Sequence, residues 1–143
     1  MSGFQHEKLE VYHLAVEFMS LAVVLAERIP RHRWFLADQL LRAAASVVLN
    51  IAEGAAEFSA REKARFYRIA RRSAAECAGA LDVLRTMKMA SPREVDSAKD
   101  LLDRIAGKLT SMIKSVEARR RGGSDRQSPR PRARPRPRPR PEA

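Results

Sequence analysis

The sequence of 143 residues contains one cysteine, Cys77, and aromatic residues make up only 6% of it. A single cysteine excludes an internal disulfide framework and a zinc site built from cysteines. The three histidines, His6, His13 and His32, do not have the spacing of metal ligands. The sequence also lacks a glycine-rich phosphate loop, an HExxH motif and a serine nucleophile elbow. It therefore predicts no metal, no cofactor and no enzymatic activity.

Long apolar runs are missing as well. None approaches the ~20 residues that a membrane-spanning helix needs, and the N-terminus lacks the basic and apolar regions of a signal peptide. We therefore expect a cytoplasmic protein with no membrane partner. Apolar residues still make up 45% of the chain, which is enough for the core of one domain. Because alanine, leucine and valine provide most of them, we expect closely packed helices.

The net charge of +11 is divided unevenly along the chain. Residues 121–143 contain eight arginines against Asp125 and Glu142, a net charge of +6, which leaves +5 for residues 1–120. Both parts are basic, and the short tail carries more than half of the excess. Polyanions are the natural partners of such a chain.

Four segments repeat apolar residues at spacings of three and four. Within residues 1–120, the predicted helices span residues 6–28, 33–53, 60–89 and 92–119. The first ends before Pro30 because the residue preceding a proline disfavours the helical conformation, and Gly54 suits the left-handed conformation that closes the second. Ser59 with Glu62 predicts a capping box for the third helix, and Pro92 fits the first position of the fourth. Because the connections are short, we predict an all-α fold, an antiparallel up-down-up-down four-helix bundle.

The first predicted helix carries two apolar stripes. One consists of Leu9, Tyr12, Val16, Met19, Val23 and Ala26, and the other of Val11, Ala15, Phe18, Ala22, Leu25 and Ile29. One stripe is sufficient for packing inside a bundle. The second indicates that another face of this helix is covered as well, and we expect another subunit to cover it.

Residues 121–143 form a tail of different composition, in which arginine and proline alternate almost strictly from residue 129 to residue 141. We predict that this tail is disordered and extended, partly in the polyproline II conformation. Its alternating arginines are candidate phosphate contacts: Arg130, Arg132, Arg134, Arg136, Arg138 and Arg140. Acidic proteins, membrane headgroups or a purely solubilising role remain open as alternatives to nucleic acid.

A polar stripe runs along the second predicted helix, within the sequence LRAAASVVLNIAEG. Arg42, Ser46, Asn50 and Glu53 follow one another at spacings of four, four and three, and therefore share one helix face. Two interpretations remain open. Either Asn50 and Glu53 cap backbone groups and pair with arginines of the third helix, or the stripe contacts a ligand or nucleic acid. Glu53 alone, without a nucleophile or metal partner, does not form an active site.

A basic ridge is predicted on the third helix. It consists of arginines at spacings of four, three and four, with one more beside them: Arg61, Arg65, Arg68, Arg72 and Arg71. Such a ridge can follow a phosphate backbone. The alternative is a solvated face with local ion pairs, such as Arg72 with Glu76. Phe66 and Tyr67 interleave with the ridge and are candidates for stacking on bases, although Phe66 also fits the apolar pattern of the core.

Three segments together, LRAAASVVLNIAEG, FQHEKLEVYHLAVEF and FYRIARRSAAECAGALDVL, resemble the bacterial four-helix-bundle family often encoded in intervening sequences of 23S ribosomal RNA genes. The resemblance covers about residues 4–116. The matching positions are Arg42, Ala43, Ala44, Ser46, Asn50, Ile51, Ala52, Glu53, Gly54, Phe66, Ala70, Ser73 and Glu76. The resemblance extends the structural polar stripe of Ser46, Asn50 and Glu53 to Ser73 and Glu76 on the third helix.

The resemblance implies a closed ring of antiparallel bundles, most often a homopentamer. A related branch is similar to the accessory variability protein of diversity-generating retroelements, a basic pentamer that binds nucleic acid and a reverse transcriptase. The arginine–proline tail is not part of the family pattern and inherits no function from it. We therefore expect a non-enzymatic oligomer that binds RNA or DNA through Arg42, the basic ridge and the tail. The alternative is a protein-binding scaffold or accessory subunit, for example of such a reverse transcriptase.

Overall fold

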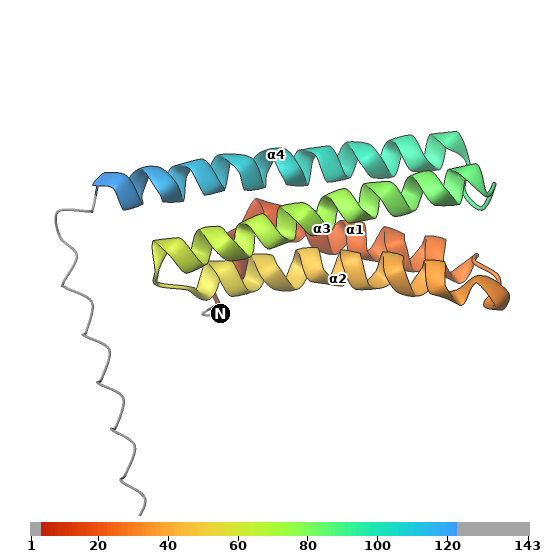
Figure 1. The fold of residues 1–143 in the computed structure, drawn as a ribbon, viewed down its shortest axis with the longest axis horizontal. Helices are drawn as coiled ribbons and strands as arrows, with labels where there is room; N and C mark the ends of the chain where they lie inside the picture. The colour runs from red at the N-terminus through yellow and green to blue at the C-terminus, as the bar shows by residue number, and fades with distance from the viewer. Residues whose placement is uncertain (1–3, 123–143) are drawn as a thin grey trace, which may run out of the picture.

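The computed structural model describes residues 4–122, and these fold into helices joined by short connections (Figure 1). The elements are the 3-10 helices η1 (Gln5–Lys8) and η2 (Arg31–Arg33) and the α-helices α1 (Glu10–Glu27), α2 (Trp34–Ala56), α3 (Ala60–Thr86) and α4 (Pro92–Gly122). No strand occurs among the described residues. Residues 123–143, which contain most of the predicted basic tail, lie outside them.

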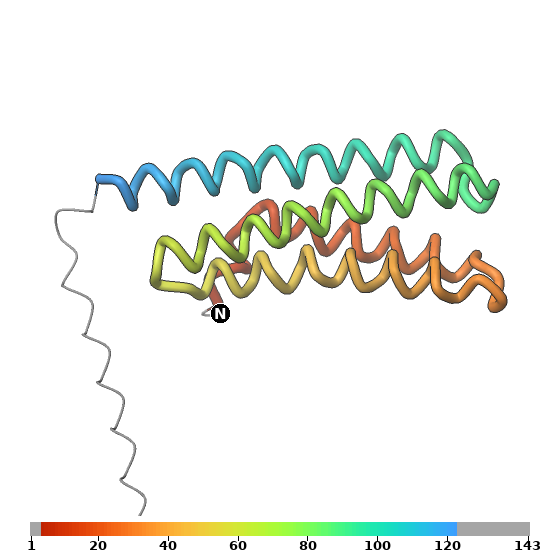
Figure 2. Tube along the Cα trace, in the orientation of Figure 1, coloured from red at the N-terminus to blue at the C-terminus, as the bar shows by residue number. Residues whose placement is uncertain are grey.

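The four α-helices pack in cyclic order. Helix α2 packs against α1 and α3, α3 packs against α4, and α4 returns to contact α1. Consecutive helices run in opposite directions, so the predicted all-α, up-down-up-down four-helix bundle is confirmed (Figure 1). The last turns of α4 project beyond the connection between α2 and α3, at the same end of the bundle (Figure 2). The chain therefore leaves the bundle at that end.

The core follows the helical periodicity of the sequence. Its largest fully buried side chains include Phe18, Leu25, Leu40, Ile51, Leu81, Leu84, Ile105 and Leu109. Of the two apolar stripes on α1, the one that contains Phe18 faces this core. The other stripe is only partly covered: Val16 and Val23 are exposed, whereas Leu9, Tyr12 and Met19 pack partly against the core and Ala26 is buried. The described chain thus contains more apolar helix surface than its own bundle covers.

Helix α1 begins later than the sequence predicts. A single helix was expected from residue 6, but the backbone is extended at Leu9 (φ −90°, ψ 125°), between η1 and α1. The break is held by His13, whose Nε2 lies 2.8 Å from the carbonyl oxygen of Glu7. Leu9 itself packs against the core. The extended residue between η1 and α1 therefore places an apolar side chain against the core where the chain joins the bundle.

The end of α2 also differs from the prediction. Gly54 was expected to close the helix in a left-handed conformation, but α2 continues to Ala56 and no described glycine has a positive φ. Helix α3 ends instead with a left-handed residue, Lys88 (φ 59°), and the N–H of Met89 donates to the carbonyl oxygen of Leu84 at 2.9 Å. This closure has the hydrogen bond of a Schellman motif and ends α3 at Thr86 rather than residue 89.

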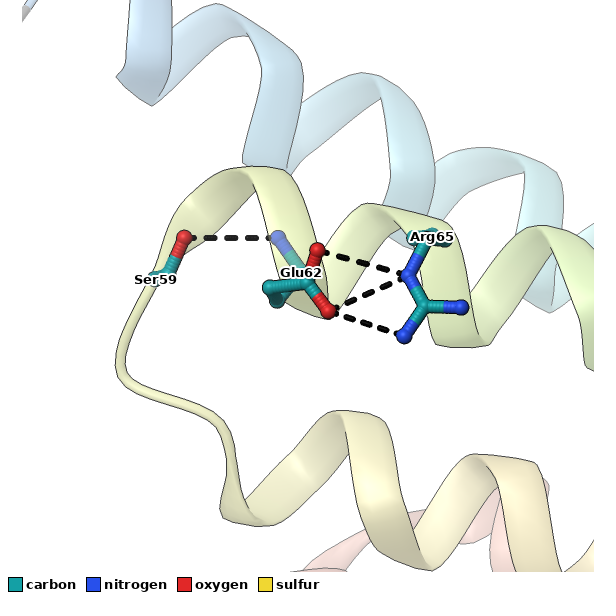
Figure 3. A network of polar contacts seen from close by, with 3 residues as sticks. All are labelled: Ser59, Glu62 and Arg65. Atoms are coloured by element: carbon teal, nitrogen blue, oxygen red, sulfur yellow. Dashed lines mark hydrogen bonds and ion pairs between the residues drawn. The ribbon is translucent and has the colours of Figure 1, made fainter. Parts of the chain in front are cut away.

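The two serine caps have different geometries. At the start of α4, the N–H of Glu94 donates to Ser91 Oγ at 3.1 Å and the N–H of Ser91 donates to Glu94 Oε1 at 3.3 Å, which is a complete capping box. At the start of α3, the N–H of Glu62 donates to Ser59 Oγ at 3.3 Å (Figure 3). The Glu62 carboxylate, however, binds Arg65 rather than returning to the cap, so only half of the predicted box forms.

Candidate nucleic-acid interface

The centre of the polar stripe lies between α2 and α3. Ser46 Oγ and Ser73 Oγ are 2.8 Å apart, and Ser73 is only 5% exposed. Asn50 Nδ2 donates to the carbonyl oxygen of Ser46 at 2.8 Å and to Ser46 Oγ at 3.0 Å. We call these three residues the serine–asparagine cluster. Because a buried hydroxyl needs a partner, the cluster fixes the register of α2 against α3.

The remaining residues of the stripe stay at the surface. Arg42 Nε donates to Asp38 Oδ1 at 3.1 Å, a pair one turn apart on α2 itself. Glu53 and Glu76 are exposed and form no hydrogen bond or ion pair within residues 4–122. The considered pairs of Glu53 with arginines of α3 and of Arg72 with Glu76 are therefore not formed. The stripe is divided into a packed centre and a solvated periphery.

Next to the cluster, Gly54 allows a close approach between α2 and α3. A Cβ atom at Gly54 would lie 2.6 Å from Tyr67 Cε1 and 3.2 Å from Phe66 Cβ. Real Cβ atoms essentially never come so close, so the buried ring of Tyr67 occupies the space that any other residue would need. This glycine is required for packing rather than for backbone conformation.

Lys63 completes this junction. Its Nζ donates to the carbonyl oxygens of Gly54 at 2.7 Å and Ala55 at 3.2 Å in the last turn of α2, and the Gly54 carbonyl also accepts from the N–H of Glu57 at 3.3 Å. Partial burial lowers the pKa of Lys63. Sequence reasoning missed the roles of Lys63 and Tyr67. A basic residue nine positions after Gly54 was a weak signal for the first, and no sequence signal identifies the second.

The predicted ridge of arginines lies on α3, with Arg61, Arg65, Arg68 and Arg72 exposed. Two of them are already paired. Arg65 Nη2 lies 2.9 Å from Glu62 Oε2 (Figure 3), a pair that lowers the pKa of Glu62, and Arg68 pairs with Glu117 of α4. Arg61 and Arg72 form no ion pair or hydrogen bond with another described residue. Exposed pairs are worth only ~0–1 kcal/mol, so a phosphate can replace either carboxylate.

Arg71 has a different environment from the ridge beside it. It is half-buried, and its Nη1 donates to Thr110 Oγ1 of α4 at 3.2 Å. This guanidinium connects α3 to α4 instead of pointing freely into solvent. Tyr67, considered as a stacking residue, is buried, with a pKa raised by that burial, and Phe66 is half-buried.

The last turns of α4 bring further arginines to the start of α3. The positive charge of Arg119 also lowers the pKa of Lys63, less than burial does. The ion pair between Arg68 and Glu117 joins the same two helices. We call this region the basic end, and it consists of Arg61, Lys63, Arg65, Arg68, Arg119 and Arg120. The six tail arginines of the predicted site, from Arg130 to Arg140, lie outside the described residues.

A second exposed surface is apolar and lies on α1 and α2. It forms a groove of about 290 Å³ lined by Val16, Met19, Ser20, Val23, Ala45, Val48 and Leu49. Leu49 is 62% exposed at its edge. We call this surface the apolar face. No polar side chain other than Ser20 interrupts it.

One described helical segment, Arg31–Ala56, is long and apolar enough to cross a membrane by length and composition alone. Asp38 and Arg42 interrupt its apolar residues, which is why the sequence shows no continuous run. Core helices of soluble bundles meet the same criterion, so it does not by itself indicate a membrane protein. Only 28% of its most apolar stretch is buried, and part of the remainder forms the apolar face.

These features define a small antiparallel helical bundle with a basic end and an exposed apolar face. Residues 7–111 match the family model of the 23S rRNA-intervening sequence protein. Because the match covers well over half of the chain, the protein belongs to this family, as the resemblance predicted. No curated protein sequence matches the chain significantly.

A solved structure shares the fold. The crystal structure at 1.70 Å resolution of a protein with unknown function from the S23 ribosomal protein family of Bacteroides thetaiotaomicron superposes with a TM-score of 0.69. The two sequences are 24% identical, and the similarity covers 73% of this chain and 98% of the other. This similarity establishes the bundle architecture.

Proposed function

We propose that this protein is a non-enzymatic, oligomeric accessory protein that binds RNA or DNA through its basic end and its arginine-rich tail. The observation that carries the proposal is the concentration of cations where α3 begins and α4 ends. Arg61 forms no ion pair among the described residues, and the carboxylates that pair with Arg65 and Arg68 are partly exposed, so a phosphate could displace them. The arginines of residues 123–143 follow directly from that end.

Self-association is supported by the apolar face. The groove that contains Val16 and Leu49 is lined almost entirely by apolar side chains. Exposed apolar surface of this kind is typical of a protein–protein interface. We propose that a second copy covers it, in a homo-oligomer that the family resemblance suggests is a pentamer. An oligomer would bring several basic ends and tails to one polyanion and so raise their effective concentration.

The binding proposal is tested by comparing the full chain with a chain that ends at Gly122. Fluorescence anisotropy with RNA, DNA and heparin at several salt concentrations measures affinity and its salt dependence. The shorter chain is expected to bind more weakly, with a flatter dependence of log K on log salt, and to melt at nearly the same temperature. An identical salt dependence for both chains would mean that the tail does not contribute to nucleic-acid binding.

The oligomer is tested by replacing Leu49 with glutamate. A charge at this exposed position of the apolar face would be buried in the proposed interface and should reduce the mass measured by light scattering. The matched control is Val83→Glu on α3, which is also exposed but lies outside the apolar face. If both variants keep the mass of the unmodified protein, the apolar face is not the subunit contact.

A second candidate function is a protein-binding scaffold or an accessory subunit, for example of a reverse transcriptase. The apolar face also favours this function, because a partner protein could cover it in place of a second copy. The two candidates differ in the behaviour of the isolated protein. A monomer that binds no oligonucleotide at low salt would favour the scaffold.

A further inference from the structure

Phe58 is the most exposed large apolar side chain of the described residues. It lies in the connection between α2 and α3, and its side chain is fully exposed. The neighbouring backbone is fixed on both sides, because the N–H of Glu57 donates to the carbonyl oxygen of Gly54 at 3.3 Å and Ser59 caps α3. An aromatic ring is therefore held in solvent at a defined place, although the bundle does not use it for packing.

The surroundings of this ring are cationic. Arg61 follows Phe58 by three residues, and the side chain of Lys63, from the first turn of α3, binds carbonyl oxygens at the end of α2 next to the same connection. One turn further along α3, the guanidinium carbon of Arg65 lies 4.6 Å from the centroid of the half-buried Phe66 ring. Glu53, Glu57 and Glu62 are the acidic residues of the same stretch, and Glu62 is bound by Arg65. Arg61 is thus an exposed cation without an ion pair, three residues from an exposed aromatic ring.

This combination is typical of proteins that bind single-stranded nucleic acid. Cations follow the phosphates, while an exposed ring stacks on a base, whose flat face is accessible only when the strand is unpaired. A duplex keeps those faces within its own stack and offers the ring no equivalent contact.

Resting on the proposed function, we infer that the connection between α2 and α3 binds a single-stranded segment of nucleic acid, with Phe58 stacked on a base and Arg61 beside its phosphate. Phe58 would supply a contact that depends on the strand being unpaired. Arg61 would supply one that depends on salt but not on pairing. The basic end then distinguishes single strands from duplexes without reading a base sequence.

The experiment measures the affinity of the full chain for fluorescent oligo(U), oligo(dT) and a mixed-sequence duplex, each of about 15 nucleotides, at fixed salt. Phe58→Ala and Phe58→Leu should both weaken single-strand binding, by roughly 5- to 100-fold, because neither provides an aromatic face. Phe58→Trp should restore it. None of the three should change duplex affinity or the slope of log K against log salt.

Phe35→Ala is the matched control. Phe35 is also an exposed aromatic residue, but it lies in the first turn of α2, at the other end of that helix, and its removal should leave single-strand affinity unchanged. Comparison of the oligo(U) and oligo(dT) arms separates RNA from DNA as the source of the strand.

Three results for Phe58→Ala would overturn the inference. The first is an affinity for single strands equal to that of the unmodified protein, and the second is an equal loss of affinity for single strands and for the duplex. The third is a smaller oligomeric mass, which would make Phe58 a subunit contact. In each case binding by the unmodified protein persists and the proposed function stands. If the unmodified protein binds none of the probes at low salt, the proposed function fails together with the inference.

Discussion

Helix α3 has two regions that use similar kinds of residues in opposite ways. Where it faces α2, Ser73 and Tyr67 are buried: the Ser73 hydroxyl meets the hydroxyl of Ser46, and the Tyr67 ring fills the space beside Gly54. At the basic end, Arg61 and Arg65 are exposed and are unpaired or bound only to a neighbour on the same helix. The first region stabilises the bundle, while the second leaves charge available to other molecules. The centre of the most distinctive sequence motif of this chain therefore belongs to its packing. Arg42 is exposed within the motif, while the cations of the basic end lie outside it.

Replacing Gly54 with alanine should affect the packed region most. The added Cβ would meet the Tyr67 ring at 2.6 Å, so the free energy of unfolding should fall by about 1–3 kcal/mol in urea denaturation. The control is Gly79→Ala on α3, where a Cβ meets nothing within 4 Å. That variant should be more stable by about 0.5–1 kcal/mol, since alanine favours a helix. Equal changes in the free energy of unfolding for both variants would mean that the contact with Tyr67 does not affect stability.

The serine–asparagine cluster should give the next largest effect. Ser73→Ala removes the hydrogen bond between the helices and leaves the Ser46 hydroxyl with Asn50 Nδ2 alone, so the free energy of unfolding should fall by about 1 kcal/mol. The double variant with Ser46→Ala should lose less free energy of unfolding than the sum of the losses of the two single variants, because the two hydroxyls act as a pair. Ser97→Ala, at an exposed position of α4, serves as the control and should be nearly neutral. Strict additivity of the two serine changes would contradict a shared hydrogen bond.

A change at the basic end should have the smallest effect on stability. Arg61→Ala removes an exposed charge that has no ion pair among the described residues, so the free energy of unfolding should change by less than about 0.5 kcal/mol. The slope of log K against log salt for nucleic-acid binding should fall by about 1, as expected for the loss of one phosphate contact. A clear loss of stability without a change in that slope would place Arg61 in the structural region instead.

The fold was predictable because its signals are local. Apolar spacing, Pro92 at a first helical position and the serine at residue 91 depend on residues within a few turns of one another. The helix ends were less predictable where the backbone adopts a conformation that the residue type does not suggest. Leu9 is extended between two helical segments, beside the contact between His13 and Glu7, and Lys88 is left-handed although it is not a glycine.

The candidate site was only partly predictable, for the same reason. The spacing of Ser46 and Asn50 showed that they share a face, but their link to Ser73 depends on how α3 packs. Glu117 lies 49 residues from Arg68, so no local pattern could show that they pair. The exposure of Phe58 is likewise a result of the fold, since an aromatic residue in the sequence is more often part of a core.

The most direct test of the account is a titration of the unmodified protein against a single-stranded oligonucleotide across a range of salt concentrations, beside a variant that replaces Arg61, Arg119 and Arg120 with alanine. We predict binding whose log K falls linearly with log salt, and a smaller slope for the variant at an unchanged melting temperature. Absence of binding by the unmodified protein at low ionic strength would contradict the account, as would equal slopes for the two proteins.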